Sequence, residues 1–201
     1  MLLDERAGES HRQGRRDRTL RTVDPIRLDL QPHLVGNLLE LRPLREDDWD
    51  DLFLAGSDPL IWEGHPAHDR YQAEAFREYF RDALDSRGAL IALERTSGRI
   101  IGSSRYFWYG PEQNELEIGW TFLARPYWGG EYNREMKRLM LDHAFQCVER
   151  VIFLVATTNR RSRRALEKIG GRLTDRIETR TIRGTDLEHV VYEIRKPRMS
   201  G

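Results

Sequence analysis

The sequence predicts an α/β (α+β) fold in which helices cover both faces of a mixed sheet. The expected elements follow in the order strand, two helices, three strands, helix, strand, helix and two strands, which is typical of such a layered domain. Residues 151–157 form a short and solidly apolar run, as in a central strand that is covered on both faces. Two strands in succession also lead through a polar or glycine-bearing turn into a helix, which is how an open sheet builds a ligand crevice.

The first part of the domain is expected to contain one strand and two helices. Residues 38–44 alternate enough to form the strand, and the acidic residues 46–48 then open a helix that stops near residues 58–59. Aromatic and apolar side chains recur at helical spacing over residues 72–86, which predicts the second helix.

In the centre of the chain, apolar and polar residues follow the pattern of strands, and predicted helices and strands alternate after it. The glycine pair at residues 129–130 precedes a long helix through Val148, and Asn159 caps a further helix that ends at the glycines 170–171. The expected strands of this part cover residues 89–94, 99–109, 115–123, 151–157, 172–178 and 189–194.

The composition of the chain argues against several classes of protein. The 201 residues carry 33 Lys and Arg against 33 Asp and Glu, so the formal net charge of zero argues against nucleic-acid binding. The longest apolar run, residues 151–156, is far shorter than the roughly 20 residues that span a bilayer. A single cysteine, Cys147, fits a reducing compartment, and we expect a cytoplasmic protein without membrane association. Residues 1–24 are expected to be a flexible or peripherally docked extension of a single domain over residues 25–198.

Two turns indicate a site for an anionic ligand. The first turn of a helix leaves backbone N–H groups unpaired, and Gly129 and Gly130 let the backbone approach an anion because no Cβ intervenes. Asn159 and Ser162 stand at the corresponding place after the next strand. A plain glycine turn and a capped amphipathic helix explain the same residues. The chain contains neither a Walker phosphate loop nor the dinucleotide G-x-G-x-x-G pattern.

Both stretches resemble the motifs of the GCN5-related N-acetyltransferases (GNAT), and the resemblance covers about residues 26–196. It is closest to the branch that acetylates the N-termini of ribosomal proteins. The residues that match motif A are Tyr127, Trp128, Gly129, Tyr132 and Glu135, and those that match motif B are Asn159, Ser162, Glu167, Lys168 and Gly170. The resemblance implies the GNAT fold, with a mostly antiparallel sheet and a splayed central strand pair. It also implies acetyl transfer from acetyl-CoA to a primary amine on a small molecule or a protein N-terminus.

The resemblance further implies where acetyl-CoA binds. Pantetheine would lie between the splayed strands, against the backbone at Phe122 and Leu123, with Asn159 and Ser162 on its other side. The backbone N–H groups that would hold the pyrophosphate belong to Trp128, Gly129, Gly130, Glu131, Tyr132 and Asn133. Two residues depart from the pattern. Glu131 replaces a glycine and brings a carboxylate near the pyrophosphate, and Leu166 stands where the family most often has a tyrosine proton donor.

Glu117 is the candidate general base, because the family often has a glutamate on this strand that acts through water. The alternative is a structural carboxylate that pairs with an arginine of a neighbouring strand, such as Arg105. A base would help because an amine is mostly protonated near neutral pH, and general-base catalysis typically contributes about 100- to 10,000-fold in rate.

The acceptor wall is expected in the polar and aromatic segment over residues 61–71, with Trp62, His65 and Arg70 as its binding residues. Structural packing of a lid is the alternative. A metal site at His65, His68 and Asp69 has no supporting cluster elsewhere, so we expect no metal. The arginines at 160, 161, 163 and 164 form either a contact to the 3′-phosphate of CoA or a solvated face.

Two other functions are compatible with these motifs. One is a non-catalytic acyl-CoA-binding regulatory module, and the other is a transferase of the same fold that uses another acyl-CoA. We expect a monomer or a homodimer whose partners are acetyl-CoA and an amine acceptor, with no nucleic acid and no membrane.

Overall fold

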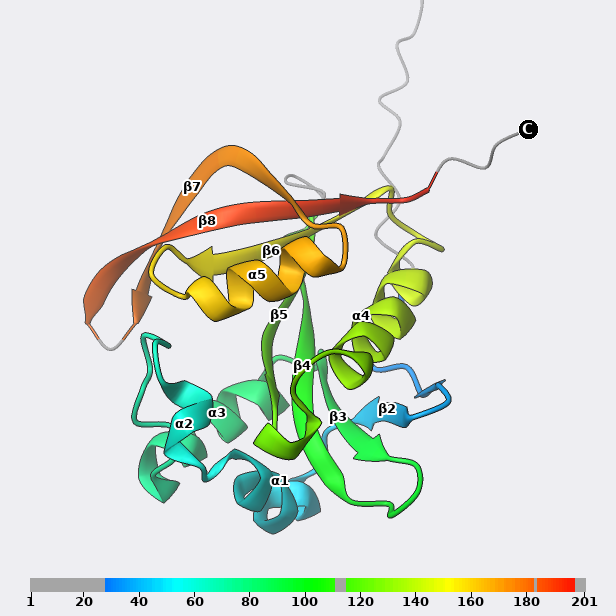
Figure 1. Ribbon diagram of the computed structural model, residues 1–201, viewed down its shortest axis with the longest axis vertical. Coiled ribbons are helices and arrows are strands. Elements are labelled where there is room, and N and C mark those ends of the chain that lie inside the picture. The colour runs from blue at the N-terminus through cyan, green and yellow to red at the C-terminus, as the bar shows by residue number, and fades with distance from the viewer. Residues whose placement is uncertain (1–27, 111–114, 183, 198–201) are drawn as a thin grey trace, which may run out of the picture.

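The computed structural model describes residues 28–110, 115–182 and 184–197. Eight strands form one sheet in the order β1-β2-β3-β4-β5-β6-β8-β7, and every neighbouring pair is antiparallel except β5 and β6 (Figure 1). This arrangement confirms the predicted mixed, mostly antiparallel sheet. The strands are β1 (Leu34–Val35), β2 (Leu39–Pro43), β3 (Ala89–Glu94), β4 (Ile100–Trp108), β5 (Leu116–Leu123), β6 (Arg150–Ala156), β7 (Arg172–Ile182) and β8 (Thr185–Arg195).

Helices cover both faces of the sheet. One apolar cluster, which includes Phe76 and Leu52, lies under the helices of the first half, and a second, which includes Met136 and Leu166, lies under those of the second half. The helices are η1 (Glu46–Asp48), α1 (Trp49–Gly56), α2 (Pro59–Trp62), α3 (Ala73–Asp85), η2 (Arg125–Tyr127), α4 (Glu131–Ala144) and α5 (Arg160–Lys168). The predicted extension over residues 1–24 lies outside the described residues.

The parallel pair β5 and β6 separates soon after it begins. Its register contains only Leu116 opposite Val151 and Glu117 opposite Ile152. Beyond this point β5 has an irregular register with β4, and Trp120 adopts a left-handed backbone with φ of 51°. Such a bulge bends a strand and releases it from its neighbour. The predicted splayed strand pair is therefore present, and it opens the sheet in the middle.

The glutamate of motif A ties α4 to the edge of the sheet. The Glu135 carboxylate accepts hydrogen bonds from the backbone N–H groups of Asn37, Leu38 and Leu39 at 2.8, 2.7 and 3.0 Å. A Cβ on Gly36 would come within 2.5 Å of the same carboxylate, so a larger residue here would displace the carboxylate from these bonds. Glu135 thus fixes the helix that begins at the glycine pair against β2.

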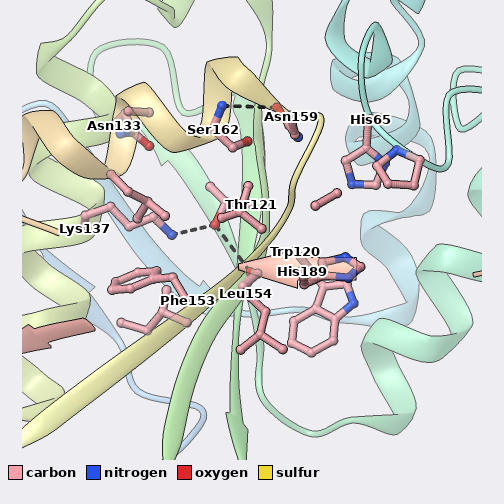
Figure 2. Close-up of a pocket in the computed structure, with 17 residues that line it drawn as sticks. His65, Trp120, Thr121, Asn133, Lys137, Phe153, Leu154, Asn159, Ser162 and His189 are labelled. Atoms are coloured by element: carbon pink, nitrogen blue, oxygen red, sulfur yellow. Dashed lines mark hydrogen bonds between the residues drawn. The ribbon is translucent and has the colours of Figure 1, made fainter. Parts of the chain in front are cut away.

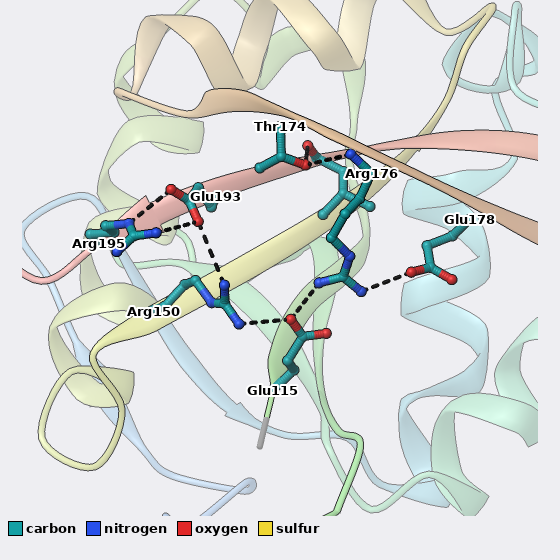
Figure 3. A network of polar contacts seen from close by, with 8 residues as sticks. Glu115, Arg150, Thr174, Arg176, Glu178, Glu193 and Arg195 are labelled. Atoms are coloured by element: carbon teal, nitrogen blue, oxygen red, sulfur yellow. Dashed lines mark hydrogen bonds and ion pairs between the residues drawn. The ribbon is translucent and has the colours of Figure 1, made fainter. Parts of the chain in front are cut away.

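The last two strands form a longer hairpin than the sequence predicts. They pair out to Ile182 opposite Thr185, whereas the expected strands stop at residue 178 and begin at residue 189. An ion-pair network holds the hairpin to the rest of the sheet (Figure 3). Glu115, just before β5, bonds to Arg150 at 2.9 Å and to Arg176 of β7, which also pairs with Glu178 at 2.8 Å.

Candidate active site: the cleft between β5 and β6

The separation of β5 and β6 opens a cleft of about 160 Å³ in the middle of the sheet (Figure 2). Its walls come from both strands, from α4 and α5, from the loop after α2 and from β8. Figure 2 shows Asn133, Lys137 and Phe153 on one side and His65, Trp120 and His189 on the other. The remaining lining residues are Pro66, Ile118, Gly119, Thr121, Leu154, Val155, Ala156, Asn159, Ser162, Ala165 and Leu166.

The start of α4 has the backbone that the glycine pair predicts. Gly129 and Gly130 have φ of 101° and 153°, in the left-handed region that favours glycine, and no atom lies within 4 Å of a Cβ built on either. Gly130 is the N-cap and makes no side-chain capping bond. This helix therefore begins with backbone donors that no cap satisfies. Glu131, the residue that departs from motif A, is exposed.

The wall on the α5 side is built by a side-chain cap. Asn159 precedes α5, and its Oδ1 accepts a hydrogen bond from the backbone N–H of Ser162 at 3.1 Å. Both residues line the cleft, as does Asn133 of α4. Three of the ten residues proposed to bind cofactor thus come together on the cleft wall.

The other proposed cofactor residues lie around the cleft without lining it. The ring of Phe122 packs against Trp62 at a centroid distance of 5.3 Å, on the face covered by the first helices. The indole of Trp128 donates to the carbonyl of Leu123 at 2.7 Å, and its ring lies 4.3 Å from the guanidinium of Arg161. The Tyr132 hydroxyl points away to Glu94 at 3.0 Å.

Glu117 is buried beside the point where the strands separate, with 1% of its surface exposed. Its Oε2 accepts hydrogen bonds from Tyr109 and from Arg180 of β7, each at 2.6 Å. The ion-pair partner of Glu117 is thus Arg180, and the suggested pairing with Arg105 is wrong. Its Oε1 lies 2.8 Å from where a Cβ on Gly119 would stand, next to the cleft.

The proposed acceptor residues Trp62, His65 and Arg70 lie together on the side of the cleft opposite α4. The Arg70 guanidinium lies over the rings of Tyr79 and Trp62 at 4.7 and 5.5 Å, and of these three residues only His65 lines the cleft. Burial, together with the charge of Arg70, lowers the pKa of His65 to about 3. His65 is therefore neutral at physiological pH.

Arg105 stands on the same side and was not predicted there. Its guanidinium lies 4.8 Å from the ring of Trp120, and within the described part of the chain its Nε and Nη2 have no hydrogen-bond partner. Burial lowers the pKa of both Arg105 and Arg70, and Arg105 further lowers that of Arg70 by charge repulsion. Two arginine side chains thus lie close together on this wall.

Lys137 and His189 are cleft residues that the sequence interpretation missed. Lys137 is 4% exposed and donates hydrogen bonds to Thr121 Oγ1 at 2.5 Å and Ser104 Oγ at 3.2 Å. Burial lowers its pKa to about 7, although the charge of Glu117 acts in the opposite direction. The sequence does indicate that Lys137 is buried, because its helical spacing from Met140 and Leu141 places all three on the same face of α4.

Comparison with known proteins agrees with this architecture. The family described as Acetyltransferase (GNAT) domain matches residues 39–172 of the chain. The chain belongs to the GNAT acetyltransferase family. This confirms the family predicted from motifs A and B, and that match extends over β2 to the start of β7. No curated protein matches the chain.

Solved structures share the GNAT fold with this chain. A GCN5-related N-acetyltransferase from Brucella melitensis has a TM-score of 0.72 at 19% identity, with 82% of this chain and 79% of that chain covered. The acetyltransferase from Agrobacterium tumefaciens str. C58 has a TM-score of 0.61 at 26% identity, with 82% and 95% covered. A ribosomal-protein-S5-alanine acetyltransferase from Vibrio fischeri has a TM-score of 0.58 at 16% identity, with 83% and 100% covered.

In the ranges that the structure describes, no group of three or more His, Cys, Asp or Glu side chains is placed to hold a metal ion. No helix within those ranges is long and apolar enough to cross a membrane.

Proposed function

We propose that this GNAT protein transfers the acetyl group of acetyl-CoA to a primary amine by direct attack. The observation that carries the proposal is the cleft between β5 and β6, which passes through the sheet beside two helix N-termini. Acetyl-CoA enters from the side of α4 and α5, and the amine enters from the side of His65 and Trp120. The thioester and the amine then meet where β5 bulges at Trp120.

The binding of acetyl-CoA is assigned to the walls on the side of α4 and α5. The backbone N–H groups at the start of α4, over residues 128–133, receive the pyrophosphate, because an uncapped helix start favours an anion. Asn133, Asn159 and Ser162 contact the pantetheine arm from the cleft wall. Glu131 is exposed, so its side chain can remain in solvent while the backbone N–H groups bind the phosphates.

The chemical step is assigned to the opposite wall. The nitrogen lone pair of the amine attacks the thioester carbonyl carbon, the C–S bond breaks, and the amine loses a proton. Glu117 receives this proton through its Oε1, directly or through water, while Tyr109 and Arg180 hold Oε2. The neutral His65 accepts a hydrogen bond from the backbone N–H of Ala67 at 3.0 Å through Nδ1, which fixes the ring for contact with the acceptor.

Binding of acetyl-CoA is expected to stabilise the protein. A ligand at 100 times its Kd adds about 2.7 kcal/mol to the free energy of unfolding, which corresponds to a rise in Tm of roughly 5–11 °C for a domain of this size. Differential scanning fluorimetry with and without 1 mM CoA measures this shift, with adenosine as the control that lacks the pyrophosphate and pantetheine. A folded sample whose Tm does not respond to CoA would contradict the proposal.

The acceptor is expected to carry a negative charge near its amine. Arg105 lies over Trp120, Arg70 lies over Trp62 and Tyr79, and neither guanidinium forms an ion pair with a described residue. The exposed Asp82 acts on the charge of both arginines, and Glu117, which acts on Arg105, is already paired with Arg180. Positively charged polyamines should therefore be poor acceptors. Amines with a free carboxylate should be acetylated about tenfold faster, in kcat/KM, than their carboxamides, which corresponds to about 1.4 kcal/mol.

An acceptor screen that follows the release of free CoA thiol measures this preference. It compares amino acids with their amides, peptides with acidic and neutral second residues, and polyamines. In Arg70→Gln the preference for the carboxylate should fall toward one while the carboxamide rate stays within a few-fold. Equal rates for both members of each pair would contradict the assigned acceptor charge.

The same assay tests the alternative functions. CoA binding without thiol release for any amine would favour a non-catalytic acyl-CoA-binding module. A panel of acyl donors tests whether the transferred group is acetyl.

A further inference from the structure

Lysine is rare in this chain, and one of its lysines lies in the cleft. The sequence contains 33 Lys and Arg residues, of which only Lys137, Lys168 and Lys196 are lysines. Lys168 and Lys196 are exposed, whereas Lys137 is 4% exposed and lines the cleft from α4. An arginine keeps its proton in proteins, but a buried lysine can release one near neutral pH. The only basic side chain that lines the cleft from α4 or α5 is thus one that can exchange a proton.

The surroundings of Lys137 leave its charge without a direct counter-ion among the described residues. The strand β4 presents the hydroxyl of Ser104, β5 presents that of Thr121, and β6 presents the ring of Phe153 at 5.7 Å from Nζ. Glu117 is the acid whose charge acts on Lys137, and Arg180 already pairs with it. Two of the three N–H groups of the ammonium are used by the hydroxyls, which leaves one for a group in the cleft.

The proposed reaction needs a proton donor on this side. When the C–S bond of the thioester breaks, the sulfur leaves as a thiolate, and a thiol of this kind has a pKa of about 8.5 in water. Leu166, which occupies the position of the usual tyrosine donor, has no proton to give. The other polar residues that line the cleft from α4 and α5 are Asn133, Asn159 and Ser162, which are not acids near neutral pH.

We infer that Lys137 is the proton donor to the sulfur of CoA. This inference rests on the proposed function. In the balanced step, the N–C bond forms and the C–S bond breaks, the amine proton passes to Glu117, and the Lys137 ammonium gives one proton to the thiolate. Solvent then returns a proton to Lys137, and Glu117 releases its own, so the enzyme ends the cycle unchanged. The pKa of about 7 for Lys137 suits this role, because a donor of that acidity protonates a thiolate readily.

The inference is tested without an acceptor substrate. Lysine labelled with ¹³C at Cε gives three signals in this protein, and Lys137→Met assigns the one of interest while Lys168 and Lys196 serve as internal references. The pH titration of the Lys137 signal is recorded for the free protein, for the complex with CoA, and for the complex with desulfo-CoA, which lacks the thiol. A proton shared with sulfur should raise the Lys137 midpoint by at least about one pH unit with CoA but not with desulfo-CoA.

The outcomes separate the inference from the function on which it rests. Equal midpoints in the CoA and desulfo-CoA complexes would overturn the role of Lys137 while leaving acetyl-CoA binding intact. Failure of either compound to bind would instead contradict the proposed function. As a second readout, folded Lys137→Met should lose about 100-fold in kcat with CoA affinity within a few-fold, and its rate should no longer fall as pH rises above 7. Lys196→Met, at the far end of β8, is the matched control and should retain the wild-type rate and pH profile.

Discussion

Glu135→Ala is expected to lower the free energy of unfolding by about 4 kcal/mol, the largest stability effect that we predict for a single side chain. The Glu135 carboxylate accepts three backbone hydrogen bonds from the turn before β2, and the N–H of the buried Leu39 would lose its partner. For a domain of this size the loss corresponds to a fall in Tm of roughly 8–16 °C. Urea unfolding and thermal melts of the purified variant measure it.

The control for this experiment is Asp142→Ala on the same helix. Asp142 is exposed and, among the residues that the structure describes, bonds only to Arg138, at 3.3 Å, so its loss should cost less than about 0.5 kcal/mol. Gly36→Ala should also destabilise the protein, because its Cβ would stand 2.5 Å from the Glu135 carboxylate. Equal stability of Glu135→Ala and Asp142→Ala would show that the three backbone bonds contribute nothing net.

The pH dependence of this difference follows from the pKa of Glu135. Burial opposes ionisation, but the three backbone N–H groups and the nearby Arg138 outweigh it, so the folded pKa lies below the ordinary value. A depressed folded pKa means that the stabilisation is fully present above the unfolded pKa, about 4.3, and is lost as pH falls through the folded value. The gap in stability between wild type and Glu135→Ala should therefore be constant above about pH 5 and shrink in more acidic solution.

The sequence predicted those parts of the fold that local patterns encode. The apolar run at residues 151–157 and the glycine and asparagine turns gave β6 and the starts of α4 and α5, because each depends on nearby residues alone. The long hairpin of β7 and β8 was predicted too short. Its outer residues, over 179–188, are mostly polar, and backbone pairing between the two strands, rather than a buried apolar face, holds them together.

Two of the residues that sequence patterns did not indicate at the candidate site share a physical reason. Arg180 reaches Glu117 from a strand 63 residues away, and His189 reaches the cleft from β8, so only the tertiary fold brings them there. Lys137 differs from these, because a lysine at a buried helix position is visible in the sequence. The pattern alone does not indicate a buried charge, because long basic side chains commonly cover apolar surface while their charge stays in water. Here the ammonium itself is buried.

Glu117→Gln is expected to lower the acetylation rate by 100-fold or more at neutral pH while CoA affinity stays within a few-fold. The amide cannot take a proton from the attacking amine, and the Oε1 of Glu117 lies next to Gly119, which lines the cleft. Because rising pH deprotonates the amine without help, the variant should regain rate in alkaline solution. The pH profile of kcat/KM, measured with the acceptor that the screen identifies, tests both points.

The ion pair with Arg180 complicates this experiment, because Glu117→Gln also leaves a partly buried guanidinium without its carboxylate. Arg180→Met resolves the two roles. If Glu117 is the base, this variant keeps its carboxylate and most of its rate, whereas Glu117→Gln alone loses 100-fold or more. If Glu117 serves only to pair Arg180, both single variants should lose the same stability and rate, and the double variant Glu117→Gln/Arg180→Met should recover them. A folded Glu117→Gln protein with the wild-type rate and pH profile would assign proton removal to water instead.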